Sequence, residues 1–286
     1  MEERISFELS LFDGDRKSVL INDLEFCVDR IMTFPKIRPQ QLKKAVSLSE
    51  EYCQIAGFRR KMLEKANSCP VLIYRLFKRD VFIFEEIEPF LRNKNTFELC
   101  YYFRKEINDF ETFINGKKIP DDFDGSFFNN ENDIDQMIEY GFICSTIEYT
   151  LKYDVIEDLN HYHFLNQEAK WSPFEWSLKP YYLDLLSFSG YFGSIKCFKH
   201  LMMNGFFIND KVMAMVVGSG CFDLFHLCMG KQIVTSEVIC MASIFCNISL
   251  LDFLFENGYH IDENDISVEI EYSVVLPFIL LLLMVI

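Results

Sequence analysis

Glycine and proline are scarce in this sequence, with 12 Gly and 8 Pro among 286 residues. An all-β sandwich needs many turns rich in these two residues, so their scarcity argues against that class and favours helices. Half of the residues are hydrophobic and 30 are Phe, which is enough for a packed core and excludes a disordered chain. We therefore expect a folded helical protein of two modest domains or one extended array.

Arginine is absent after Arg104. Residues 1–118 carry 21 Lys and Arg against 19 Asp and Glu, a net charge of +2, whereas residues 119–286 carry 7 against 24, a net charge of −17. Phosphate binding depends on Lys and Arg, so the second half excludes nucleic acid as a partner. The expected partner is an unknown protein that offers a basic or an apolar segment.

The ten cysteines include no Cys-x-x-Cys pair and are scattered through apolar stretches. Cys197, Cys228 and Cys240 occupy places where Leu or Val would fit, as expected of small buried hydrophobic residues in a reducing compartment. The N-terminal stretch to Ser18 is charged and lacks an apolar segment of signal-peptide length. We predict a cytoplasmic protein, in which the glycosylation sequence at Asn247 has no role.

The first part of the chain reads as a succession of helices. Residues 40–67 follow Pro39 with a broadly helical spacing of apolar residues, and residues 84–91 and 97–114 continue that pattern. The apolar run 71–77 after Pro70 fits a short helix or a buried strand equally well. A polar connection begins at Gly116, so we place a domain boundary between residues 118 and 119.

The second part of the chain repeats. Residues 184–205, 211–229 and 237–258 superimpose without internal gaps through their helical parts. Gly193 and Gly220 occupy the same position in the middle of their segments. The third segment has Cys246 at this position and so departs from the pattern. Gly205 and Gly258 each end a segment, twelve residues after its middle position. A weaker half-repeat ends at Met137-Ile138-Glu139-Tyr140-Gly141.

These segments resemble ankyrin repeats, in which a glycine separates two helices and a second glycine ends the unit. The layout is similar to a large protist family of ankyrin-repeat proteins that carry a helical N-terminal region and a domain of unknown function. The resemblance implies a helix-pair solenoid over residues 119–265, with one poorly recognisable repeat around Tyr149 to Leu165. The middle positions are 27 and 26 residues apart, not about 33, so the β-hairpin fingers should be short or absent.

The C-terminal residues 266–286 break the repeat pattern. Val274 to Ile286 are 13 residues without a charge, whereas a membrane-spanning helix needs about 20. Pro277 interrupts the run, and no Lys or Arg follows Lys231. Two interpretations remain. The tail is a truncated or frame-shifted end that packs on the last repeat or stays loose, or it anchors the protein to a membrane. The short run and its missing basic flank disfavour the anchor.

Motifs for chemistry are weak throughout the sequence. Asp122, Asp124, Gly125 and Glu131 match four positions of a calcium-binding EF-hand loop, but its first position is Pro120, which has no side-chain ligand. His161 and His163 form half of a metal site that no other residue completes. Gly218-Ser-Gly220 resembles the start of a dinucleotide loop without its third glycine. We therefore predict no catalytic, cofactor or metal site, and a non-enzymatic protein.

The first helix of each repeat carries the candidate binding residues. In an ankyrin stack its variable positions line the concave groove, and here most of them are apolar. Either a neighbouring element buries these residues, or they form an apolar groove for a peptide. Under the second interpretation the protein is a scaffold for protein–protein interaction. The candidate partner-binding residues are Phe188, Tyr191, Phe192, Met215, Ser219, Met241, Ile244 and Phe245.

Overall fold

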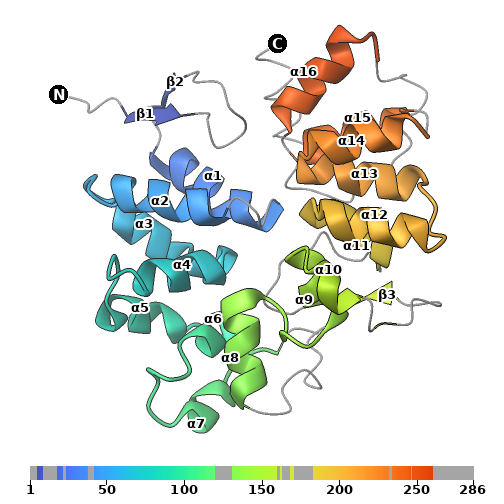
Figure 1. Ribbon diagram of the computed structural model, residues 1–286. Coiled ribbons are helices and arrows are strands. Elements are labelled where there is room, and N and C mark those ends of the chain that lie inside the picture. The colour runs from blue at the N-terminus through green and yellow to red at the C-terminus, as the bar shows by residue number, and fades with distance from the viewer. Residues whose placement is uncertain are drawn as a thin grey trace. The chain divides into compact units, whose positions relative to one another are not determined.

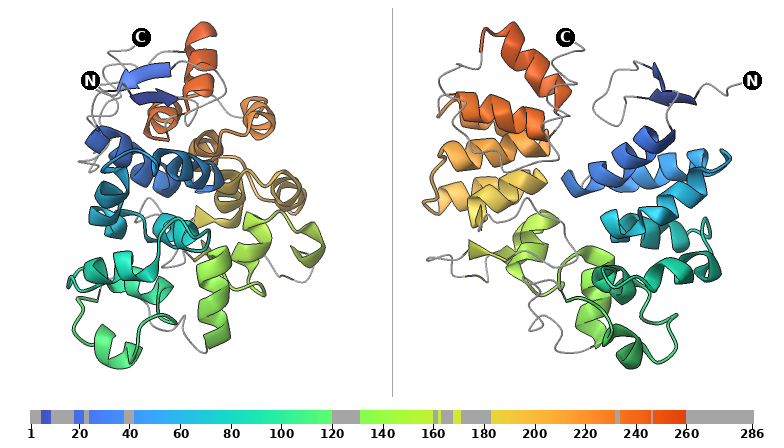
Figure 2. Two further views of the ribbon diagram at one scale, coloured as in Figure 1. Left: turned by 90° about the vertical axis from the view of Figure 1, so that its left-hand side faces the viewer. Right: turned by 180° about the vertical axis from the view of Figure 1, so that it is seen from behind.

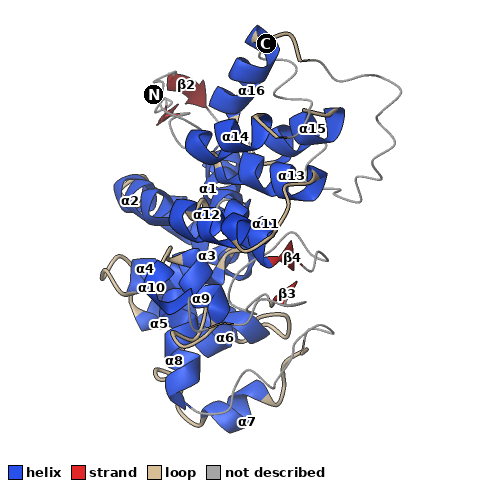
Figure 3. Ribbon diagram, turned by 45° about the vertical axis from the view of Figure 1, so that its right-hand side comes forward, coloured by secondary structure: helices blue, strands red, loops and turns tan. Residues whose placement is uncertain are grey.

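The computed structural model describes residues 5–8, 18–21, 24–37, 42–119, 131–159, 162, 168–170, 183–231, 234–245 and 247–259. Over these residues the protein is mostly helical with four short strands, which confirms the predicted all-α class (Figure 3). The chain divides into two compact units, of which unit 1 runs to Cys144 and unit 2 begins at Ser145. The predicted boundary at residue 118 lies earlier in the chain, and the predicted tail 266–286 lies outside the described residues.

Unit 1 begins with an antiparallel strand pair and continues as helices (Figure 1). The strands are β1 (Ile5–Glu8) and β2 (Ser18–Ile21). The helices are α1 (Leu24–Ile37), α2 (Leu42–Tyr52), α3 (Phe58–Glu64), α4 (Pro70–Phe77), α5 (Phe84–Leu91), α6 (Phe97–Tyr102), α7 (Phe110–Ile114) and α8 (Glu131–Tyr140), with a 3₁₀ turn at Ala66–Ser68.

Two of the expected helical stretches are each divided in two. Residues 40–67 form α2 and α3, and Gly57 between them has a φ of 83°, which a continuing right-handed helix cannot contain. Residues 97–114 form α6 and α7, and Asp109 has a φ of 51° at the break. Residues 71–77, for which the sequence left helix and strand open, lie in helix α4, with Pro70 at its first position.

Helices α2, α4 and α6 repeat one buried pattern at a spacing of 27 residues. In each helix two adjacent residues and a third three positions later point into the core, with at most 2% exposure. Helix α2 packs on α4 and α4 on α6, so the three patterns form one continuous core. The residues are Ala45, Val46 and Ser49 in α2, Leu72, Ile73 and Leu76 in α4, and Leu99, Cys100 and Phe103 in and just after α6.

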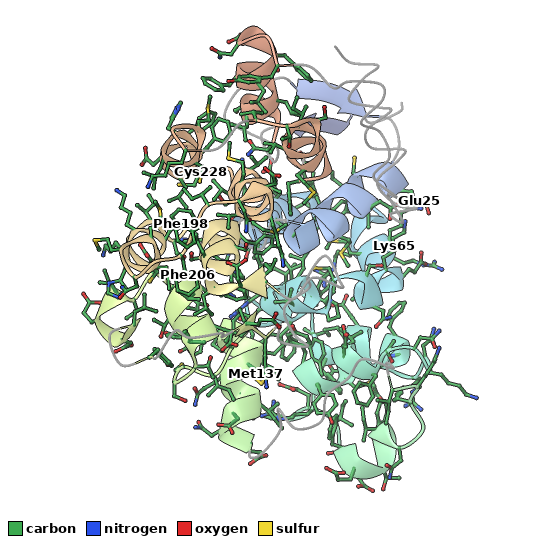
Figure 4. All side chains as sticks on the ribbon, turned by 90° about the vertical axis from the view of Figure 1, so that its right-hand side faces the viewer. Glu25, Lys65, Met137, Phe198, Phe206 and Cys228 are labelled. Atoms are coloured by element: carbon green, nitrogen blue, oxygen red, sulfur yellow. The ribbon has the colours of Figure 1, made fainter. Side chains whose placement is uncertain are left out.

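Ion pairs connect α1 to the end of α3. Lys61 Nζ lies 3.2 Å from Glu25 Oε2, and Lys65 Nζ lies 3.3 Å from Glu25 Oε1. Lys65 also pairs with Asp29. Figure 4 shows Glu25 and Lys65 close together on these two elements. Because the carboxylates are more than half exposed, these pairs align the two helices and add little to the free energy of folding.

Unit 2 consists of helix pairs, with a short antiparallel strand pair before the third of its helices. The strands are β3 (Glu168–Ala169) and β4 (Leu183–Asp184). The helices are α9 (Ile147–Lys152), α10 (Ile156–Leu159), α11 (Leu185–Phe192), α12 (Ile195–Met203), α13 (Asp210–Ser219), α14 (Phe222–Met229), α15 (Ser236–Ile244) and α16 (Ile248–Glu256). A helix pair thus occupies the region around Tyr149 where the sequence leaves room for one.

The first helices of these pairs stack in the order α9, α11, α13, α15, and each carries its second helix beside it (Figures 1 and 2). Helix α11 packs on α13 and α13 on α15. Each pair buries its apolar side by stacking on the next, which is how solenoid repeats obtain a core. The connection from Asn204 to Asn209, between α12 and α13, contains no strand, whereas the strand pair β3 and β4 precedes α11.

The turn inside a pair has the same backbone geometry in successive pairs. Asp154, Gly193 and Gly220 have φ values of 56°, 71° and 71°, in the left-handed region. Gly205 and Gly258, which end their second helices, have φ values of 93° and 81°. After each of these two glycines the next amide bonds back into the helix, from Phe206 to Leu201 and from Tyr259 to Leu254. The repeated glycines therefore mark helix ends that need positive φ.

Buried polar side chains join neighbouring pairs through backbone atoms. The Ser194 hydroxyl donates to the carbonyl of Leu151, and the Asn247 side-chain amide donates to the carbonyl of Val217 at 2.8 Å. Both carbonyls belong to the residue three positions before the left-handed turn residue of the preceding pair. Asn247 is fully buried, so it is a packing residue, in agreement with the expectation that its glycosylation sequence has no role.

The carboxylate of Asp154 binds the helix pair that follows its own. Its two oxygens accept hydrogen bonds from the backbone N–H groups of Cys197 at 2.8 Å and Lys196 at 3.2 Å, in the first turn of α12. One residue thus supplies a left-handed turn to its own pair and an N-terminal cap to the following pair.

Small residues let the first helices approach closely. A Cβ added at Gly190 of α11 would lie 2.8 Å from Cγ2 of Val216 in α13. A Cβ added at Gly218 of α13 would lie 2.5 to 2.8 Å from three ring carbons of Phe245, which follows α15. Real Cβ atoms do not reach such distances, so each glycine fixes the separation of two stacked helices.

We expect Gly218→Ala to destabilise the protein by about 1–3 kcal/mol, because the new methyl group overlaps the Phe245 ring. Urea denaturation followed by circular dichroism measures the change. Gly116→Ala is the matched control, since its Cβ would meet no atom within 4 Å and its expected effect is within about 0.5 kcal/mol. Adding Phe245→Leu should recover part of the loss, and a purely additive double variant would contradict the steric explanation.

Asp154→Ala should cost about 1–3 kcal/mol, because it removes the cap of α12 and places alanine at positive φ. Asp154→Asn keeps an acceptor oxygen and a side chain that tolerates this backbone, so most of the stability should remain. Thermal melting of the three proteins checks the order. Wild-type stability in both variants would show that neither the cap nor the turn depends on this side chain.

Candidate interaction surface

The structure places the eight candidate groove residues mainly in the interior. Phe188, Tyr191 and Phe245 are at most 2% exposed, and Phe192 and Met215 are also buried. Ser219 and Met241 are half-buried, and the Ile244 side chain lies outside the described residues. This burial favours the interpretation that they are core residues. A role for them in partner binding stays a prediction.

The aromatic candidates pack on one another across the stack. The rings of Tyr191 and Phe245 lie 5.8 Å apart, although two stacking steps separate α11 from the end of α15. Phe188 and Phe192 lie 4.9 Å apart on successive turns of α11. Gly218 leaves room for the Phe245 ring against α13 because it has no side chain, and the same ring reaches Tyr191. Three residues from three pairs thereby form one contact, and it leaves these rings little surface for a partner.

The exposed apolar surface of unit 2 lies instead at the end of α12 and in the following connection. Met203 is 77% exposed and Phe207 is 83% exposed, the highest values among the exposed large hydrophobic residues of the described chain. Tyr153 is also exposed, but its ring stacks on Tyr149 at 4.6 Å and faces the Lys152 ammonium. Phe206, which Figure 4 labels, is only half-buried.

The sequence contains an apolar run that indicates this surface, although the run is not part of the repeat pattern. The apolar run Phe206-Phe207-Ile208 directly follows Gly205, the glycine that ends a repeat. A connection normally exposes its side chains, so an aromatic residue there is a candidate contact residue. The candidate groove residues come instead from the apolar first helices, where burial is the ordinary outcome.

Ionisable groups of the described residues do not assemble into a metal-binding cluster. Asp122 and Asp124, and likewise His161 and His163, lie outside the described residues. His226 packs its ring against Phe222, Phe225 and Phe253 between α14 and α16. Gly218 and Gly220 serve packing and the turn, which explains them better than a dinucleotide loop does.

The described cysteines are free thiols, and most are buried. Burial raises the pKa of Cys228 to about 12. Burial together with the nearby Asp154 carboxylate raises the pKa of Cys197 to about 12. Both thiols remain protonated at neutral pH and act as small apolar side chains. Cys240 lies in α15, but its side chain is outside the described residues.

Comparison with protein families, with curated proteins and with solved structures gives no match for this chain. Within the described residues, no helix combines the length and the apolar character needed to cross a membrane.

Alkylation distinguishes buried from half-buried thiols. At pH 8, iodoacetamide should modify Cys144 and Cys221 at least about tenfold faster than Cys197 and Cys228, because the buried thiols are both inaccessible and protonated. Peptide mass spectrometry of timed samples measures the four rates. In guanidinium chloride the difference should disappear. Equal rates in the native protein would contradict the described packing of α12 and α14.

Proposed function

We propose that this protein is a non-catalytic scaffold for protein–protein interaction, and that unit 2 is a stack of short ankyrin-type repeats. The observation that carries the proposal is the repeated unit itself. Four helix pairs follow one another, a left-handed residue separates the two helices in three of them, and a glycine of positive φ ends the second helix in two. Stacks of this kind present extended surfaces whose residues vary independently of the core.

Met203 and Phe207 are the residues that we assign to the contact surface. A large aromatic side chain and a flexible thioether, both mostly exposed, are side-chain types that are enriched in protein–protein interfaces. Their position at the end of a second helix and in a finger connection matches where repeat proteins carry contacts. Because Gly218 packs closely against Phe245, we assign the first helices to holding the stack together and not to binding a partner.

Affinity purification with quantitative mass spectrometry tests the proposal on the full chain in cells of its source. Met203→Asp together with Phe207→Asp should reduce the recovery of specific partners at least about tenfold, with an unchanged melting curve. Ile83→Asp together with Ile119→Asp is the matched control, since these residues are also exposed and apolar but belong to unit 1. Partners that both double variants retain, or both lose, would contradict the assignment.

Tyr191→Asp and Phe245→Asp separate the two interpretations of the first helices. Each places a charge at a position with at most 2% exposure, so we expect loss of cooperative folding. Circular dichroism and urea denaturation measure this. Intact melting combined with loss of a partner would restore the apolar groove as the binding site.

A further inference from the structure

Helix α8 of unit 1 is acidic and faces basic residues. It contains Glu131, Asp133, Asp135 and Glu139 and no Lys or Arg. Three cationic side chains from α4 and from the turn after α6 contact it, and the ion pairs measure 2.6 to 2.7 Å. They are Arg75 with Glu139, Arg104 with Asp135, and Lys105 with Asp135.

The contact depends largely on these charges. Of the ten residues of α8, the buried ones are Met137, which Figure 4 labels, and Ile138. The carboxylates of Asp135 and Glu139 are more than two-fifths exposed, so water and salt screen their ion pairs. Arg75 and Arg104 also donate to the backbone carbonyls of Glu139 and Glu131, so the same cations hold both ends of the helix. A helix that buries two apolar side chains and depends on such polar contacts opens more easily than the helices of the core.

Arg104 is not fully satisfied by α8. Its side chain is 8% exposed, and its Nη2 bonds to Asp135 Oδ1 at 2.6 Å, but its buried Nε has no hydrogen-bond partner. The second oxygen of Asp135 is engaged by Lys105 at 2.7 Å. The guanidinium therefore presents an unused donor on the edge where a carboxylate could bind side-on through Nε and Nη2. A longer acidic side chain at the place of Asp135 would supply that contact.

We propose that the surface formed by Arg75, Arg104 and Lys105 is a binding site for an acidic amphipathic helix of a partner protein, and that α8 is its resident competitor. The partner displaces α8 by offering a glutamate to Arg104 and two adjacent apolar residues in place of Met137 and Ile138. This inference goes beyond the proposed function, because it assigns a separate site in unit 1 that does not require the repeats of unit 2.

Peptide binding to the full chain tests the inference. The receptor is the variant Asp135→Lys with Glu139→Lys, whose own α8 should no longer occupy the site. The probe is a fluorescent peptide of residues 131–142, measured by anisotropy. We expect binding to the variant at least about tenfold tighter than to the wild type, weakening about tenfold between about 0.05 and 0.3 M NaCl. A peptide with Glu at position 135 should bind more tightly still.

The outcomes against the proposal are equally defined. Binding that is equal for variant and wild type, or equal for a control peptide with Lys at positions 135 and 139, would overturn it. Adding Met203→Asp and Phe207→Asp to the receptor should leave its affinity for the peptide unchanged. This outcome distinguishes the site in unit 1 from the contact surface that we assign to unit 2.

Hydrogen exchange on the wild type covers the case in which the variant does not fold. The amides of α8 should exchange at least about threefold faster in about 0.5 M than in about 0.05 M NaCl, while those of α4 keep their rates. Equal responses of the two helices would show that α8 is part of the core and would overturn the proposal.

Discussion

The stacked first helices of unit 2 can share a core only if their backbones come close, and small residues decide where that happens. Gly190 admits the side chain of Val216, and Gly218 admits the ring of Phe245. The ring then reaches Tyr191, so three helix pairs meet at one contact. Helix pairs of this length bury too little surface alone, and the stability of each depends on this approach.

The helical class and the repeated glycines of unit 2 could be predicted from the sequence because those features are local. A left-handed turn needs glycine or a short polar residue, and Gly193, Gly220, Gly205 and Gly258 have that geometry. In unit 1 Gly57 marks one break in the same way, but Asp80 and Asp109 take the left-handed conformation at two others, and aspartate is not a specific signal for it in the sequence. The 27-residue spacing of the buried positions in α2, α4 and α6 could not be predicted in the same way, since residues as different as Ser49, Leu76 and Phe103 fill one position.

The candidate groove shows why a binding surface is harder to predict than a fold. The first helices are apolar on nearly all sides, and sequence periodicity does not distinguish a helix buried on all sides from one with an exposed apolar face. The deciding residue is Gly218, whose missing side chain leaves a space for Phe245. That complementarity joins residues 27 positions apart in the chain. Phe207 could have been found, because it follows a repeat-ending glycine.

The polar contacts that join helices differ in burial between the two units, and this difference predicts different responses to solution conditions. In unit 2, Ser194 and Asn247 bond buried backbone carbonyls between pairs, where neither salt nor a competing side chain has access. In unit 1, α8 is held by carboxylates that remain in contact with water. We therefore expect salt to weaken the attachment of α8 and to leave the stack intact.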